Sequence, residues 1–195
     1  MDITKLRGWS LALGCALLGS CLGGGGTEDV GGGSAGECAS ITGGASHVTK
    51  NDNAGAGCLG CSVSNEQMAA DGDLSTAASV NAPNSFADQG PSIRATAQSG
   101  IVFPAGQVAA VLFTPPVAGG LNPPAQAVTI ATYLSGTFQE SGSSYLEGTE
   151  SDGLTFKGFV TSKPFDAVEI MVSDTEAALA PWSINEICSD ATPPQ

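Results

Sequence analysis

The chain has few basic residues and almost no histidine. Its 195 residues include 6 lysines and arginines against 19 aspartates and glutamates, a formal net charge of −13. A protein that binds nucleic acid needs a positive surface to displace counterions from phosphates, so no nucleic acid is expected as a partner. A polybasic membrane patch is excluded for the same reason. The single histidine, His47, leaves little scope for histidine metal sites or histidine catalysis.

Aromatic residues are scarce, at 6% of the chain, and the N-terminal apolar run is short. That run, Trp9 to Leu18, falls well below the roughly 20 residues that span a bilayer. Lys5 and Arg7 precede it and small residues follow it, which is typical of a secretory signal peptide. We place this signal peptide at residues 1–20.

The end of the apolar run carries a motif for lipid attachment. Leu18-Gly19-Ser20-Cys21 resembles the lipobox of bacterial lipoproteins, in which cleavage leaves an acylated cysteine as the first residue. The resemblance implies that Cys21 is lipidated and that the membrane is contacted through a lipid anchor. We therefore expect the protein in the bacterial cell envelope, at the outer membrane or the cell surface. Ordinary secretion with cleavage elsewhere is the alternative.

Glycine content marks a domain boundary. Sixteen of the 27 glycines lie in residues 1–60, and residues 21–37 hold almost no core-forming side chains. This composition predicts a lipidated cysteine followed by a flexible tether. The folded domain is expected at residues 38–190, with a short tail at 191–195.

Four cysteines remain after the signal peptide and Cys21: Cys38, Cys58, Cys61 and Cys188. In an exported protein this number suggests two disulfides, for which three pairings exist. Cys38 opens the folded part and Cys188 closes it, and the first and last strands of many β-sandwiches are neighbours. We favour Cys38 with Cys188 and Cys58 with Cys61. The C-x-x-C spacing is also that of redox pairs, but the strand-helix context that such pairs need is not visible.

Short β-type runs dominate the chain after residue 90. They are rich in β-branched and aromatic residues, are separated by Gly, Pro and Ser turns, and lie at 93–97, 107–114, 126–134, 137–140, 144–147, 154–161, 165–172 and 182–188. Such a series predicts an all-β, antiparallel β-sandwich or barrel. One short helix is expected at Ser64–Ala70, because Ser64 and Gln67 have the spacing of a capping box.

Two segments far apart in the sequence carry a resemblance to a known family. Asp71-Gly72-Asp73 with Thr76, and the C-terminal run Ile184 to Ile187, resemble the first loop and last strand of discoidin-like domains. These are coagulation-factor type C and related carbohydrate-binding modules of the galactose-binding jelly-roll superfamily. The resemblance spans roughly residues 58–190 and implies a jelly-roll sandwich. Sugar-binding members usually have an aromatic residue just after the threonine, where this chain has two alanines.

The same resemblance implies a calcium site. In the family, the Asp-Gly-Asp loop and a glutamate of the final strand often enclose calcium, which here corresponds to Asp71, Asp73, Thr76 and Glu186. Calcium takes six to eight oxygen ligands, and carboxylates and hydroxyls supply them. Its role would be structural, since it would tie the first loop to the last strand. The alternative is an acidic turn in which Asp71 or Asp73 caps the backbone.

Function is expected to be binding and not catalysis. The first hypothesis is a surface lipoprotein whose sandwich binds an extracellular glycan or protein. The second is a structural accessory subunit that packs on a partner through a sheet face. Trp182, the one tryptophan after the signal peptide, is the candidate ligand-binding residue, with core packing as its alternative. An exposed aromatic beside polar side chains would favour the first hypothesis, and a broad apolar patch would favour the second.

Overall fold

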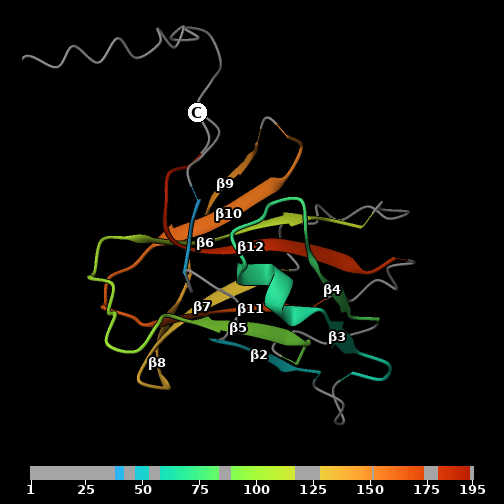
Figure 1. Cartoon of the computed structure of the whole chain (residues 1–195), viewed down its shortest axis with the longest axis horizontal. Coiled ribbons are helices and arrows are strands. Elements are labelled where there is room, and N and C mark those ends of the chain that lie inside the picture. Colours follow the sequence, from blue (N-terminus) through green and yellow to red (C-terminus); the bar gives the residue numbers. More distant parts are fainter. Residues whose placement is uncertain are drawn as a thin grey trace, which may run out of the picture. The chain divides into compact units, whose positions relative to one another are not determined.

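The computed structural model describes residues 38–41, 47–52, 58–83, 89–116, 128–150, 152–173 and 180–193. These residues form two antiparallel β-sheets and one short 3-10 helix (Figure 1). The two sheets bury a shared core, so the expected all-β sandwich class is confirmed. The expected signal peptide, Cys21 and the tether lie outside the described residues. Within the described part, no helix has the length and hydropathy to cross a membrane.

The first sheet has seven strands in the order β3-β4-β12-β6-β10-β9, with β1 also paired to β12. Its strands are β1 (Cys38–Ser40), β3 (Ser62–Ser64), β4 (Ala78–Asn81), β6 (Val108–Thr114), β9 (Leu146–Thr149), β10 (Thr155–Val160) and β12 (Trp182–Ala191). Strand β12 runs one residue past the domain end expected at 190. The central strand β6 reads VAAVLFT and is buried along most of its length, as expected for a strand covered on both faces.

The second sheet has five strands in the order β2-β5-β11-β7-β8. Its strands are β2 (Val48–Asn51), β5 (Ser92–Thr96), β7 (Val128–Leu134), β8 (Thr137–Ser141) and β11 (Ala167–Val172). In β11, Val168 and Ile170 are buried while Glu169 and Met171 are partly exposed, so this sheet has one core face and one outer face. Ser135 and Gly136 have positive φ angles of 50° and 77°, which suits the two-residue turn between β7 and β8.

The expected helix is shorter and of a different type. It is a 3-10 helix, η2 (Glu66–Ala70), preceded by Asn65 in the left-handed conformation with no side-chain cap. The capping box expected at Ser64 and Gln67 is therefore wrong. Ser64 belongs instead to β3, where it pairs with Ser79 of β4, so it cannot also begin a helix.

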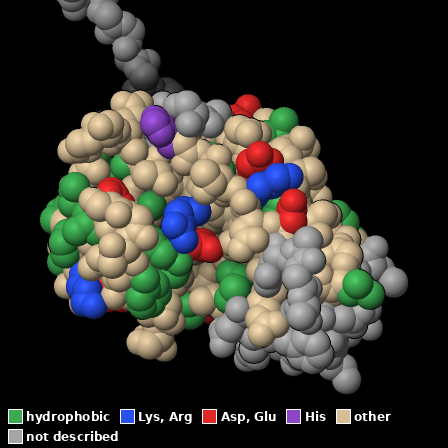
Figure 2. All heavy atoms as spheres, turned by 90° about the horizontal axis from the view of Figure 1, so that it is seen from below, with side chains coloured by type: hydrophobic (Ala, Val, Ile, Leu, Met, Phe, Trp, Pro, Cys, Tyr) green, Lys and Arg blue, Asp and Glu red, His purple; other side chains and the backbone are tan. Residues whose placement is uncertain are grey.

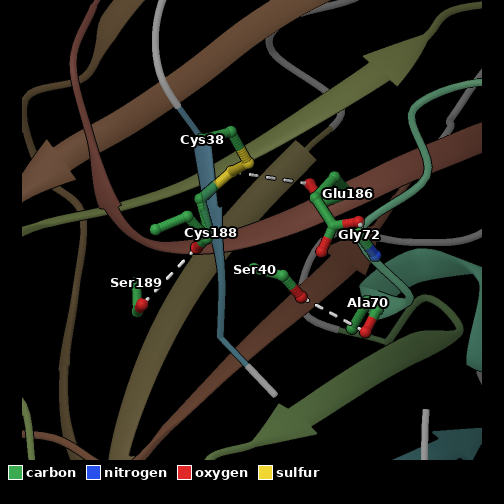
Figure 3. The surroundings of a disulfide bond; sticks show 8 residues. Cys38, Ser40, Ala70, Gly72, Glu186, Cys188 and Ser189 are labelled. Atoms are coloured by element: carbon green, nitrogen blue, oxygen red, sulfur yellow. Dashed lines mark hydrogen bonds between the residues drawn. A yellow bond between two sulfur atoms is a disulfide. The ribbon is translucent and has the colours of Figure 1, made fainter. Parts of the chain in front are cut away.

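Two disulfides join the cysteine pairs that the sequence favoured. Cys38 of β1 is bonded to Cys188 of β12, with Cα atoms 5.3 Å apart and a sequence separation of 150 (Figure 3). Cys58 is bonded to Cys61, only 3 residues away. The first bond links the two ends of the folded part, and the second closes a tight loop before β3.

Removing the long-range disulfide should cost far more stability than removing the short one. Closing a loop of 150 residues restricts the unfolded chain by roughly 5 kcal/mol in the chain-entropy model, and closing the C-x-x-C loop by about 2 kcal/mol. We expect C38S/C188S to lower the free energy of unfolding in urea by about 3–5 kcal/mol. The matched double variant C58S/C61S should lose about 2 kcal/mol or less. Equal losses in the two variants would contradict this order.

Candidate functional site

The loop 71–76 meets the last strand, as the family resemblance implied. The backbone N–H of Gly72 donates to Glu186 Oε2 at 2.9 Å, across 114 residues of sequence (Figure 3). Gly72 has a φ of 80°, a conformation that favours glycine. The pairing of β12 with β6 shifts register between Ile184 and Glu186, and such a bulge changes the direction of the side chains around it. The bulge therefore lets β12 present polar side chains to the loop.

Asn185 makes a second tie between the loop and β12. Its side-chain amide donates to the carbonyl oxygens of Leu74 at 3.0 Å and Thr76 at 3.2 Å. Sequence reasoning missed this residue. The signal was two adjacent polar residues, Asn185 and Glu186, inside an otherwise apolar strand, where each needs a polar partner once buried.

Inside the loop, the two aspartates organise the backbone. Asp71 accepts hydrogen bonds from the backbone N–H of Asp73 and the hydroxyl of Thr76, both at 2.9 Å. Asp73 accepts from the Ser75 N–H at 2.9 Å and its hydroxyl at 2.6 Å, and these bonds lower the pKa of Asp73. This is the hydrogen bonding of an aspartate-capped turn.

Glu186 is the one deeply buried carboxyl group at this junction. It is 1% exposed, and its Oε1 atom accepts no hydrogen bond. Burial raises the pKa of Glu186 to about 7. The nearby Asp71 charge adds to this rise, while the Gly72 N–H, which donates to Oε2, opposes it. The Ser40 hydroxyl lies nearby but donates its hydrogen to the Ala70 carbonyl, 3.2 Å away.

The four expected calcium ligands fit a cation only in part. Glu186 offers a buried oxygen without a partner, and Asp71 lies close enough to influence its charge. Asp73 directs its carboxylate to Ser75, and the Thr76 hydroxyl is a donor to Asp71. Across the described ranges, no three His, Cys, Asp or Glu side chains gather closely enough to hold a metal. The Asp71–Glu186 pair is thus the part of the predicted set that suits a cation.

Trp182 does not serve as a surface platform. Its side chain is 2% exposed and its ring centroid lies 5.8 Å from that of Phe113 in the core. The ligand-binding role predicted for Trp182 is therefore corrected to core packing. The physical reason is the pairing of Trp182 with Val80 of β4, which places its side chain on the core face of the first sheet.

A different cluster of polar and aromatic residues occupies the outer face of the second sheet. We call Arg94, Tyr133, Phe138 and Glu169 the outer cluster. Arg94 Nε donates to Glu169 Oε2 at 3.0 Å, and the guanidinium carbon lies 3.6 Å from the centroid of the Tyr133 ring. The rings of Tyr133 and Phe138 meet edge to face with centroids 5.9 Å apart. These contacts form one connected group across β5, β11, β7 and β8.

Strand register explains how these side chains meet. Glu169 of β11 lies opposite Arg94 of β5, and Ala167, two residues earlier, lies between Thr96 and Tyr133. The guanidinium must cross β11 to reach the tyrosine ring. The small side chain of Ala167 leaves room for that crossing.

The outer cluster is organised but still accessible. The side chains of Arg94 and Glu169 are 32% and 18% exposed, and Phe138 is 55% exposed. Partial burial acts to raise the pKa of Glu169, but hydrogen bonds from Ser92, Arg94 and Tyr133 outweigh it and keep that pKa below its usual value. Glu169 is therefore an ionised acceptor at neutral pH. The face seen in Figure 2, on the side where β2, β5 and β8 lie in Figure 1, shows acidic and basic side chains in contact beside hydrophobic ones.

A shallow pocket of about 400 Å³ lies near β8 and β10 and is lined largely by serines. Its carboxylate, Glu140, accepts from the backbone N–H groups of Ser162 at 2.7 Å and Lys163 at 2.9 Å, and also from the Ser162 hydroxyl. These bonds hold β8 to the loop after β10. The carboxylate is thus committed to structure.

Comparisons with protein-family models, curated proteins and solved structures find no match to this chain. The site is therefore interpreted from its own chemistry.

The burial of Glu186 predicts a pH dependence of stability. Its pKa is raised from 4.5 to about 7 on folding, so the native state favours the protonated form. The stability that protonated Glu186 contributes to the folded state is complete below a pH of about 4.5 and is lost as the pH rises through 7. In EDTA, the difference in unfolding free energy between the wild type and E186Q should change by about 3 kcal/mol over this range. If the unfolding free energies of the wild type and E186Q changed in parallel with pH, this would contradict a buried Glu186 with a raised pKa.

Proposed function

We propose that this protein is a bacterial envelope lipoprotein, anchored through Cys21, whose jelly-roll domain binds an extracellular glycan or protein without catalysing a reaction. The observation that supports the proposal best is the outer cluster. It places an exposed phenylalanine and a donor–acceptor pair on one sheet face, connected through the ring of Tyr133, and ligand sites combine such aromatic and polar groups. Its ion pair and hydrogen bonds hold the polar groups in place before any ligand arrives.

The distribution of exposed hydrophobic residues supports binding over a role as a packing subunit. Among the described residues, the large exposed hydrophobic side chains come from several loops, two strands and the 3-10 helix: Leu59, Met68, Leu74, Ile101, Val102, Phe138 and Val160. A subunit that packs through a sheet face needs a broad continuous apolar patch. The outer cluster instead mixes charge with aromatic surface.

Calcium belongs to the proposal as a structural ion. Asp71 and Glu186 would hold it, with Asp73 and Thr76 as further oxygen donors from the same loop. The buried Oε1 atom of Glu186 supports this assignment, because it lacks the partner that a buried carboxylate oxygen needs. The ion would neutralise two neighbouring acidic groups and fix the loop to β12.

Calcium should raise the melting temperature of the EDTA-treated protein at pH 7.5. A ligand at 100 times its Kd stabilises the native state by about 2.7 kcal/mol, which corresponds to a rise of roughly 5–10 °C for a domain of this size. D71N and E186Q should lose the effect, whereas E66Q, which changes an acidic side chain outside the loop, should keep it. No heat of binding and no change in melting temperature would remove calcium from the account.

Binding itself is tested by a glycan array probed with the full chain, with and without calcium, and by titration onto intact cells. We expect saturable binding with a Kd in the micromolar to millimolar range, as for a small exposed site. Binding should disappear after reduction and unfolding of the protein. Absence of saturable binding to every glycan and to cell surfaces would overturn the proposed function.

A further inference from the structure

We propose that the outer cluster binds a neutral polysaccharide chain, with one sugar ring stacked on Phe138 and hydroxyls of another ring of the same chain bound by Arg94 and Glu169. This inference rests on the proposed function and names its site and its class of ligand. It is carried by three features of the outer face: a fixed exposed aromatic ring, a paired donor and acceptor, and a charge balance that disfavours acidic ligands.

Phe138 supplies the stacking surface. More than half of its side chain is exposed, at 55%, and its edge-to-face contact with Tyr133 restrains the ring. The apolar C–H face of a pyranose packs on such a ring and removes it from water. Tyr133 is itself held under the Arg94 guanidinium, so the aromatic platform is preorganised.

Arg94 and Glu169 supply the hydrogen bonds. A guanidinium has five N–H donors, and Nε and one terminal nitrogen of Arg94 are directed to Glu169 Oε2. The remaining donors and the ionised carboxylate lie side by side on a partly exposed surface. Adjacent hydroxyls of a sugar both donate and accept, so they match a neighbouring donor and acceptor better than a purely ionic ligand does.

The charge of the protein selects a neutral ligand. From Cys21 onward the chain has 18 acidic residues and 4 basic ones, a net charge of −14. Arg94 is the only arginine in that part of the sequence, and its charge is compensated by Glu169. A uronate or a sulfated sugar would meet general repulsion with no uncompensated cation in the outer cluster to offset it.

The outer face also has room for a chain of sugars. Short side chains lie beside the outer cluster in the same row of the sheet. Thr49 of β2 pairs with Arg94 of β5, and Ala131 of β7 pairs with Glu169 of β11. In a second row across the strands, Ala167 of β11 pairs with Thr96 of β5 on one side and with Tyr133 of β7 on the other. Five strands at about 4.8 Å spacing make this strip roughly 19 Å wide, which exceeds a single sugar ring. An extended polysaccharide lying across the strands would contact the whole row.

The test is affinity electrophoresis of the full chain in native gels that contain galactomannan, dextran, mixed-linkage glucan or polygalacturonate. The wild type should be retarded by at least one neutral polymer and not by polygalacturonate. F138A and R94Q should weaken the binding about tenfold or more, as for residues at the centre of an interface. F138Y should retain it, because it keeps the aromatic face.

Matched controls separate the site from general surface effects. L59A truncates a more exposed hydrophobic residue in the Cys58–Cys61 loop, and K50Q removes a cation from the exposed Lys50–Asp52 pair, and both should bind like the wild type. The melting temperature of F138A should be close to that of the wild type, since the side chain is exposed. F138A therefore still tests the outer cluster as the binding site if R94Q is destabilised.

The outcomes distinguish this inference from the proposed function. Retardation of F138A equal to that of the wild type would overturn the outer cluster as the site, although binding as a function would stand. Retardation by polygalacturonate alone would overturn the neutral class. If no polymer retards the wild type while the glycan array or the cells show saturable binding, the inference fails alone. If nothing binds in any assay, both fail.

Discussion

The burial of the C-terminal strand β12 is the constraint on which the rest of the structure depends. It pairs with β1, β4 and β6, and it carries Cys188, Asn185 and Glu186, which fasten the first strand and the loop 71–76. Ile184 and Ile187 are fully buried, and each such side chain contributes about 1.5–3 kcal/mol on leaving water. A strand near the end of the sequence thus organises elements from its beginning, and this non-local closure holds the sandwich together.

This closure decides which surface is left for function. The centre of the first sheet is buried on both faces: its outer side carries a second apolar cluster that includes Ala110, Leu112 and Phe156, all at most 1% exposed. The second sheet buries one face and leaves the other to solvent, so polar and aromatic side chains accumulate there. The charged groups Arg94 and Glu169 on that face are paired, and Arg94 stacks on Tyr133. The acidic loop beside Glu186 joins the start of the domain to its last strand.

Sequence patterns could predict the long strands but not the short ones or the contacts between strands. Every strand after residue 90 overlaps a predicted β-type run, although β9 begins two residues after the start of the run expected at 144–147. By contrast, β1 to β4 are three or four residues long and largely polar, so only pairing with partners defines them. Trp182 was ambiguous because periodicity does not show whether the first residue of a strand is covered. The ion pair of Arg94 and Glu169 joins residues 75 apart, and only strand register brings them together. Asn185 stands out as a polar residue in an apolar strand, but its partners are backbone carbonyls, which the sequence does not identify.

The central claim is that β12 is the most protected element of the domain, and native-state hydrogen exchange tests it most directly. If its pairing closes the fold, the amides of Ile184, Ile187 and Cys188 should exchange only through global unfolding, with the free energy measured in urea. Amides of the edge strands β8 and β9 should exchange faster, through local opening. Exchange in β12 as fast as in those edge strands, while β7 and β11 remain protected, would contradict the account.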